Sequence, residues 1–509
     1  MSAAGESSPS RRIAANTILR TGGEVVAKAA SLAFFVVMAR ELGKDDFGDF
    51  NFALSLATLV IPAAGFGMDS LLAREVARNR GHVHLYLSNV SVVKIVGAVA
   101  LLGLTAIVVN VAGYDSDAKL AVYLVGGGVA LENLGRTWQA AMQAHERLGL
   151  VSGALIVQRT VTSAVGIALM LGGAGLVAVS AVFLAGAAVG LVAAHLLLRA
   201  RVVAPRLDID RSRWLPLVRA GIPIGLVTLL FGMLLQLDVV LLSLLGGDSD
   251  EVGVYGAAFR LVAATMFLSW AFGQATQPWL ARQEDDRALP LARGYELGLK
   301  TLTAALLPIG VAFATLAEPI VETVYGDGYE GAVVPLRLLS AVVALYGLNQ
   351  FTSVLLISRY RPEDMRRILL VVLAQNVVFN LILIPPLGAD GAAISGAASA
   401  VLLAGLSLHA GRRVTGRLGL ARVLSGPALA GAAMAAVLSA LQPSLWVGVP
   451  LGAVIYVAVL TLWERSAYPD DFEVIVQTLR RRGGQEPTRS ATASATSDVE
   501  AGGEPAAMS

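Results

Sequence analysis

Two long apolar stretches flank one short charged turn near the start of the chain. Residues 17–39 read TILRTGGEVVAKAASLAFFVVMA, residues 40–46 read RELGKDD, and residues 47–67 read FGDFNFALSLATLVIPAAGFG. About 20 apolar residues in a helix cross the roughly 30 Å hydrocarbon core of a bilayer. The stretch therefore predicts a transmembrane hairpin, and its first helix carries ionisable side chains that lipid alone does not tolerate.

The composition extends this pattern to the whole chain of 509 residues. Hydrophobic residues make up 56% and charged residues 15%, whereas soluble domains carry about 25% charged residues. The apolar runs are continuous, which favours helices over the alternating strands of a membrane barrel. Cysteine is absent, the five histidines are scattered, and no nucleotide-binding or nucleophile motif appears. We therefore predict a protein that is not an enzyme, with no catalytic residue, metal site or cofactor.

The apolar runs predict an all-α polytopic membrane protein with about 14 transmembrane helices. Arginine gathers in alternate loops and acidic residues in the intervening ones, a pattern that places both termini in the cytoplasm and the protein in the cell (plasma or inner) membrane. The predicted helix centres are Ala29, Ala57, Ala98, Ala130, Val161, Ala187, Leu230, Phe267, Ala305, Val343, Leu373, Ser399, Ala432 and Val454.

The two halves of the chain repeat each other. Residues 172–175 read GGAG and residues 388–391 read GADG at corresponding places. Because each repeat holds an even number of helices, the two six-helix lobes are expected to form a parallel repeat around a central cavity. The predicted parts are a cytoplasmic tail at 1–14, an N-lobe at 15–200, an inter-lobe cytoplasmic loop at 201–215, a C-lobe at 216–415, two extra helices at 420–465, and a cytoplasmic, largely disordered tail at 466–509.

Several short motifs resemble one known family. They are ARELG at 39–43, FG at 47–48, FALS at 52–55, GMD at 67–69, RE at 74–75 and GVYGAAFR at 253–260. Together they resemble the polysaccharide-transporter proteins, which are Wzx-type oligosaccharide flippases of the multidrug/oligosaccharidyl-lipid/polysaccharide (MOP) exporter superfamily. The last two helices are similar to those of the lipid II flippase and some other branches.

The resemblance implies a MATE-like fold that moves a polyprenyl-(pyro)phosphate-linked oligosaccharide from the cytoplasmic to the outer leaflet by alternating access, for cell-surface polysaccharide biosynthesis. It implies contacts with membrane lipid, a coupling ion (proton or sodium), and a polysaccharide polymerase or glycosyltransferase as partners, and no nucleic acid. Three alternatives stay open: a lipid II flippase, a MATE-like multidrug or cation antiporter, and a membrane scaffold or polymerase. A polymerase is expected to show a large extracytoplasmic loop, which the sequence lacks.

Ionisable residues inside apolar helices are the candidate site, because a charge in the bilayer needs a cavity or a partner. Glu24 and Lys28 lie one helical turn apart in the first helix, and Glu132 and Arg136 do so in the fourth. Arg159 lies at a depth similar to that of Arg136, on the next helix. We predict that these cations bind the phosphate of the substrate.

The second half supplies the remaining candidates. Asp238 and Arg260 are about equidistant from the turn near Asp248, which predicts an ion pair within the membrane. Gln375 and Asn376 are polar enough to bind sugar hydroxyls or to join helices. Since a drug antiporter needs an acidic cavity, the excess of cations favours the flippase. The candidate cavity residues are Glu24, Lys28, Glu132, Arg136, Arg159, Asp238, Arg260, Gln375 and Asn376.

Overall fold

The computed structural model describes residues 9–282, 291–358, 362–416 and 418–473. Over these residues the regular structure is entirely helical. The predicted tails at the two ends fall partly outside the described residues, as does the side chain of Glu24. The helices are α1 (Pro9–Val60), α2 (Met68–Arg78), α3 (Val83–Val111), α4 (Ser116–Ala144), α5 (Leu148–Leu171), α6 (Leu176–Arg201), α7 (Trp214–Leu244), α8 (Ser249–Arg282), α9 (Leu291–Thr315), α10 (Ala317–Tyr325), α11 (Val333–Ser358), α12 (Pro362–Thr415), α13 (Leu420–Leu441) and α14 (Leu445–Ala467).

Two of these helices are transmembrane hairpins. The backbone is non-helical at Gly43 in α1 (φ 79°) and at Gly388 in α12 (φ 53°), and glycine adopts positive φ without a steric penalty. Within the described ranges, eleven helical segments are long and apolar enough to cross a membrane, and α1 and α12 each count once among them. Helix α4, which packs against α3, α5 and α6, supplies one more span. With α1 and α12 counted as two spans each and α4 added, the described residues agree with the predicted number of about fourteen.

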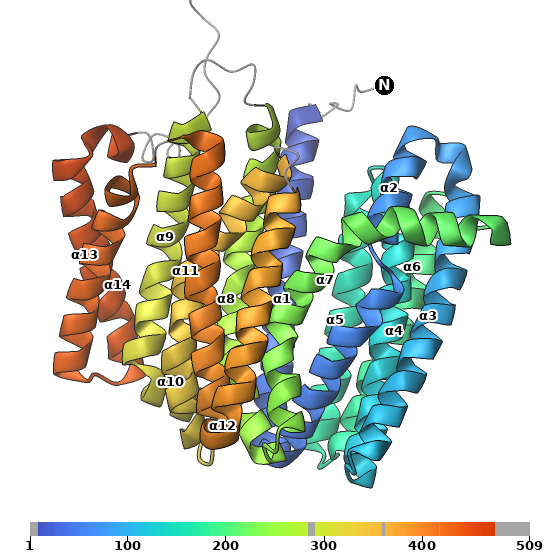
Figure 1. The fold of residues 1–509 in the computed structure, drawn as a ribbon, viewed down its shortest axis with the longest axis horizontal. Coiled ribbons are helices and arrows are strands. Elements are labelled where there is room, and N and C mark those ends of the chain that lie inside the picture. The colour runs from blue at the N-terminus through green and yellow to red at the C-terminus, as the bar shows by residue number, and fades with distance from the viewer. Residues whose placement is uncertain (1–8, 283–290, 359–361, 417, 474–509) are drawn as a thin grey trace, which may run out of the picture.

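The spans form two lobes. The N-lobe comprises α1 to α6, and the C-lobe comprises α7 to α12, with the short α10 between the spans α9 and α11 (Figure 1). Helices α13 and α14 pack against each other and against α9 at the outer edge of the C-lobe. Helix α1 runs between the lobes, where it contacts α4 and α5 on one side and α7 and α8 on the other. The predicted architecture of two six-helix lobes and two extra helices is confirmed.

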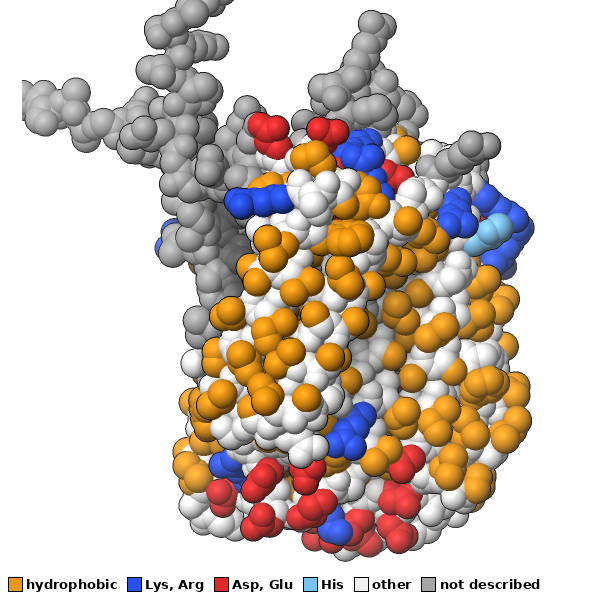
Figure 2. All heavy atoms as spheres, turned by 90° about the vertical axis from the view of Figure 1, so that its left-hand side faces the viewer, with side chains coloured by type: hydrophobic (Ala, Val, Ile, Leu, Met, Phe, Trp, Pro, Cys, Tyr) orange, Lys and Arg blue, Asp and Glu red, His pale blue; other side chains and the backbone are white. Residues whose placement is uncertain are grey.

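The two ends of the bundle differ in charge. Figure 2 shows a broad hydrophobic band above a cluster of acidic side chains at the lower end. We call this the acidic end; it includes Asp115, Asp248, Glu318 and Asp327. The opposite end, where α1 begins, is called the basic end; it includes the arginines Arg74, Arg78, Arg80, Arg147, Arg199, Arg201, Arg206, Arg211 and Arg213.

The connection between the lobes is an ordered strap rather than a free loop. Its residues 206–210 run along α3, where Ser88 and Asn89 bond to the backbone of Arg206, Asp208 and Asp210. The first turns of α7 then lie across the N-lobe, and the helix turns into the bundle further on (Figure 1). Pro223 lies inside α7, and proline in a helix interior removes one hydrogen bond and bends the helix.

Candidate functional site

A cavity of about 410 Å³ lies between the lobes, where the second half of α1, the start of α2, α4 and α7 meet. Its polar wall comes from the N-lobe, and α7 supplies the opposite wall with Thr228 and Gln236. A cavity at the interface of two lobes is where transporters of this architecture hold substrate. The charged and amide side chains that line it are Asp69, Glu132, Asn133, Arg136 and Gln236.

One side of the cavity is a break in the second span. After Val60 the chain forms a short 3-10 helix, and Phe66 (φ 32°) and Gly67 (φ 72°) then turn it before α2 begins. A Cβ atom on Gly67 would lie 2.5 Å from the amide nitrogen of Gly225 on α7. The break therefore brings the two lobes into backbone contact, and only glycine fits there in this conformation.

A buried ion pair fixes the start of α2, directly after the break. Lys94 on α3 is 1% exposed, and its ammonium donates to both carboxylate oxygens of Asp69 at 2.7 Å. It also donates to the Asn133 carbonyl (2.7 Å) and to the Thr137 hydroxyl (3.0 Å) on α4. Lys94 thus joins α2, α3 and α4. Lys94 is not among the residues that line the cavity, but it holds the lining residue Asp69.

Replacing Lys94 by methionine is expected to destabilise the protein by about 3 kcal/mol or more, because Asp69 then loses its buried countercharge. The double variant Lys94→Met, Asp69→Asn is expected to recover much of this loss. Thermal unfolding of the two variants in detergent measures the difference. Equal stability of the single variant and the unmodified protein would contradict the assignment of Lys94 as the support of the break.

Of the predicted cations of α4 and α5, Arg159 pairs with Glu132 and Arg136 lines the cavity. The Glu132 carboxylate accepts a hydrogen bond from Gln158 Nε2 (2.5 Å) and lies 3.5 Å from Arg159 Nη2. Arg136 lines the same cavity and makes no ion pair among the described residues. Glu132 thus neutralises Arg159 rather than the Arg136 of its own helix, which leaves the Arg136 guanidinium available to an anion.

Of the two candidate residues on the first helix, the structure describes the side chain of Lys28 only. Lys28 is exposed on α1, the helix that runs between the lobes. The Glu24 side chain lies outside the described residues. The proposed role of both residues in the cavity stays a prediction.

Asp238 lies in a separate polar cluster inside the C-lobe. The carboxylate is 5% exposed and accepts hydrogen bonds from the Tyr255 hydroxyl (3.0 Å), Asn376 Nδ2 (2.9 Å) and Asn380 Nδ2 (2.7 Å). The Ser399 hydroxyl belongs to the same hydrogen-bond network, because it accepts from Asn376 Nδ2 and donates to Gln375 Oε1. The amides join α12 to α7 here, and no cationic side chain among the described residues pairs with Asp238.

The predicted ion pair between Asp238 and Arg260 is wrong. Arg260 donates two hydrogen bonds to Asn51 Oδ1 (3.0 and 2.7 Å), and its guanidinium lies 4.0 Å from the ring centre of Phe35. Both partners belong to α1, because the side of α8 that carries Arg260 faces the other lobe. Equal distance from a turn predicts depth in the membrane but not the direction of the side chain around the helix axis.

The lobes are in close contact at the acidic end. A Cβ on Gly253 of α8 would lie 2.1 Å from the carbonyl oxygen of Lys44, so the backbones of α1 and α8 touch. Asp49 accepts a hydrogen bond from the Ser249 hydroxyl (2.6 Å), and Lys44 pairs with Asp250. These contacts close the acidic end of the interface between the lobes.

Sequence reasoning missed Asn51 as the partner of Arg260 and Asp69 as a cavity residue. Asn51 is buried in the apolar second span, and a buried amide needs a hydrogen-bond partner. That signal was available in the sequence. Asp69 could not be placed from the sequence, because its position depends on the break at 61–67.

The two-lobe helical fold and the cavity between the lobes define a polytopic membrane transporter. Residues 13–284 match the model of the family described as polysaccharide biosynthesis protein. This is more than half of the chain, so the chain belongs to that family, and the predicted resemblance is confirmed. No curated protein matches.

Solved structures share the fold at low sequence identity. A lipid II flippase MurJ in an inward closed conformation superposes with a TM-score of 0.74 at 14% identity, covering 88% of this chain and 99% of that one. An inward-facing multidrug resistance MATE family transporter of the MOP superfamily gives 0.64 at 16% identity, covering 76% and 94%. A MOP superfamily transporter from Pyrococcus furiosus, with a binding pocket of reverse polarity, gives 0.58 at 17% identity, covering 78% and 94%.

Proposed function

We propose that this protein flips a polyprenyl-(pyro)phosphate-linked oligosaccharide from the leaflet at the basic end to the opposite leaflet. The observation that carries the proposal is the cavity between the lobes, which contains Arg136 without an ion-pair partner among the described residues. Membership of a polysaccharide biosynthesis family supports a saccharide substrate. The close contact at the acidic end supports a resting state that receives substrate from the basic end.

The arrangement of charges supports a phosphate site. A guanidinium offers a planar pair of donors that matches phosphate oxygens. Arg136 is available, whereas Arg159 is held by Glu132 at 3.5 Å. A phosphate that reaches Arg159 has to compete with Glu132, so binding and release are coupled to an exchange of partners. The saccharide then occupies the rest of the cavity and the polyprenyl tail stays in lipid.

Complementation of a flippase-deficient strain tests this proposal. The unmodified gene is expected to restore surface polysaccharide, with the amount of protein in the membrane measured in parallel. A lipid II flippase is the second candidate, because the MurJ structure superposes over 99% of its length. Rescue of a lipid II flippase mutant, but of no polysaccharide mutant, would replace the first candidate by the second.

We propose that a monovalent cation, proton or sodium, drives the cycle at Asp238. A buried carboxylate without a countercharge is unfavourable, and binding a proton or a sodium ion neutralises it. Oxygen ligands of the kind that sodium takes are the Asp238 carboxylate, the Tyr255 hydroxyl and Asn380 Oδ1, which makes no hydrogen bond among the described residues. Because Asn376 and Asn380 connect α12 to α7, occupation of the site changes how these helices are joined.

Asp238→Asn is expected to remove the cation dependence of the protein. A cation that binds only the folded state raises the melting temperature, so sodium or acidic pH is expected to stabilise the unmodified protein and leave this variant unchanged. Asp327→Asn, which changes an exposed carboxylate at the acidic end, is the matched control. An equal shift in the Asp238 variant and the unmodified protein would rule out Asp238 as the coupling site.

The charge difference between the ends supports cytoplasmic termini, because cytoplasmic loops of membrane proteins are rich in arginine and lysine. The native chain has no cysteine, so single cysteines can be labelled without background. A cysteine in place of Gly328 at the acidic end is expected to react with an impermeant thiol reagent added outside cells, and one in place of Ser212 is expected not to react. The reverse result would contradict the proposed direction of transport.

A further inference from the structure

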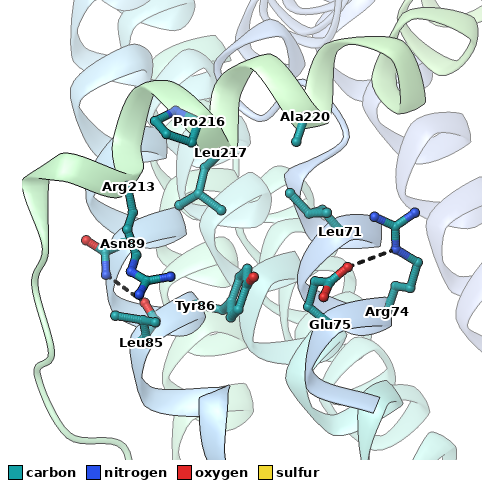
Figure 3. Close-up of a pocket in the computed structure, with 10 residues that line it drawn as sticks. All are labelled: Leu71, Arg74, Glu75, Leu85, Tyr86, Asn89, Arg213, Pro216, Leu217 and Ala220. Atoms are coloured by element: carbon teal, nitrogen blue, oxygen red, sulfur yellow. Dashed lines mark hydrogen bonds and ion pairs between the residues drawn. The ribbon is translucent and has the colours of Figure 1, made fainter. Parts of the chain in front are cut away.

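A second cavity, of about 280 Å³, lies at the basic end, outside the cavity between the lobes. The first turns of α7 roof it and α2 and α3 form its walls (Figure 3). Arg74 of α2 and Arg213, which directly precedes α7, stand on opposite sides, with Tyr86 and Glu75 between them. The volume is at the low end of the range for ligand pockets, which suits a headgroup better than a whole metabolite.

The strap and the first turn of α7, at residues 206–215, have the composition of a segment at the membrane surface. Leu207 is 88% exposed, and Ile209 and Leu215 are also exposed, although the charged residues Asp208, Asp210, Arg211 and Arg213 stand between them. Exposed apolar side chains close to arginines are typical of segments that lie in the headgroup region of a bilayer. The first turns of α7 also run across the direction of the spanning helices (Figure 1), as expected of a helix parallel to the membrane plane.

The electrostatics of this cavity fit a single negative charge. Glu75 is held by Arg74 (3.2 Å) and Arg78 (3.7 Å), and Asp210 is held by Arg213 (3.1 Å). Hydrogen bonds from Ser212 hold the pKa of Asp210 below its usual range, so this carboxylate stays ionised at neutral pH. Among the residues that line the cavity, Arg74 and Arg213 are positively charged and Glu75 is negatively charged, which leaves one net positive charge.

Three side chains of the cavity have hydrogen-bond donors that no described residue uses. The side chains of Arg74 and Arg213 are 54% and 52% exposed, and each uses only part of its guanidinium for its carboxylate. The Tyr86 hydroxyl makes no hydrogen bond among the described residues. The amide of Asn89, by contrast, already has its partners. Its nitrogen donates to the backbone of Leu85 and Asp208, and its oxygen accepts from the Asp210 amide and the Trp214 indole. Asn89 therefore fixes the strap, and the two arginines and Tyr86 are the ligand-binding groups.

We infer that this cavity binds the phosphodiester headgroup of an anionic phospholipid from the leaflet at the basic end. The phosphate lies between Arg74 and Arg213, and the acyl chains run beside the exposed Leu215 into the bilayer. The bound lipid joins α2 to the strap and to the first turns of α7. It thereby stabilises the arrangement in which the start of the C-lobe rests on the N-lobe.

The test is a titration of the purified full-length protein, delipidated in neutral detergent, with phosphatidylglycerol or phosphatidylcholine, followed by melting temperature and native mass spectrometry. We expect saturable binding of one phosphatidylglycerol and no comparable shift with phosphatidylcholine. Arg74→Gln, Arg213→Gln is expected to weaken binding by about tenfold per arginine, the factor for one lost charge-assisted hydrogen bond. The matched control Arg199→Gln, Arg201→Gln removes two exposed arginines of the basic end outside the cavity.

Three results would overturn the inference. Equal affinity in both double variants would show general attraction to the basic end rather than a site. Unchanged affinity in the Arg74, Arg213 variant would remove the site altogether. Binding of inorganic phosphate or glycerol 3-phosphate as tight as that of phosphatidylglycerol would make it a site for soluble anions. Melting of each variant in lipid-free detergent verifies that it is folded before the titration is interpreted.

Discussion

Replacing both Arg136 and Arg159 by glutamine is expected to abolish transport while leaving the amount of protein in the membrane unchanged. Arg136 lines the cavity and Arg159 lies 3.5 Å from Glu132, which lines it too, so a phosphate would lose its charge-assisted contacts to both. Each such contact contributes about 1.5–3 kcal/mol, so the double change is expected to lower the affinity by two orders of magnitude or more. Complementation of a flippase-deficient strain measures the effect.

Matched variants separate a phosphate site from a general charge effect. Arg159→Lys keeps the charge but loses the planar fork, and is expected to retain part of the activity. Arg147→Gln with Arg199→Gln removes two exposed arginines of the basic end and is expected to transport normally. Normal complementation by the Arg136, Arg159 double variant would exclude the phosphate site, although the fold assignment would stand.

A disulfide across the acidic end is expected to stop transport completely and reversibly. Asp49 and Ser249 are joined by a 2.6 Å hydrogen bond between the lobes, and a Cβ on the neighbouring Gly48 would lie 1.9 Å from the Ser249 carbonyl oxygen. Cysteines at 49 and 249 are therefore close enough for a disulfide or a short thiol crosslinker. Alternating access requires this end to open, so the crosslinked protein is expected to be inactive and a reductant to restore it.

Because the native chain contains no cysteine, the introduced pair is the only possible disulfide within the chain. Each single-cysteine variant under the same oxidant is the control and is expected to stay active. Full transport by a protein whose crosslink has been verified on a gel would mean that the acidic end does not open. That result would contradict alternating access between these lobes.

The sequence was sufficient for the helical spans and for the separation of arginine and acidic side chains to opposite ends, because span length and the placement of charge are properties of single segments. It also indicated the turn at Gly43, where a charged stretch separates two apolar ones. It did not predict the break at 61–67, because Pro62 and Gly67 are compatible with an apolar span until α7 is packed against them. Backbone contact with Gly225 is a tertiary feature that one chain segment does not encode locally.

The candidate site likewise has one part that the sequence could predict and one part that depends on helix packing. Glu132, Arg136 and Arg159 were placed together because their depth and helical face follow from short spacings within neighbouring helices. Asp238 and Arg260 were paired wrongly because the rotation of α8 is set by α1, which packs against it. The partners Asn376 and Asn380 come from α12, far along the chain, so their convergence on Asp238 depends on the packing of the C-lobe.

The central claim is that this protein moves a polyprenyl-linked saccharide across a bilayer, and reconstitution measures this movement directly. Vesicles hold a fluorescent polyprenyl pyrophosphate saccharide in both leaflets, and an impermeant glycosidase outside cleaves only the exposed molecules. With the unmodified protein, the substrate of the inner leaflet is expected to become accessible, whereas the Arg136→Gln, Arg159→Gln variant leaves it protected. Persistent protection in vesicles that contain the folded, unmodified protein with sodium and proton gradients of either direction would contradict the claim.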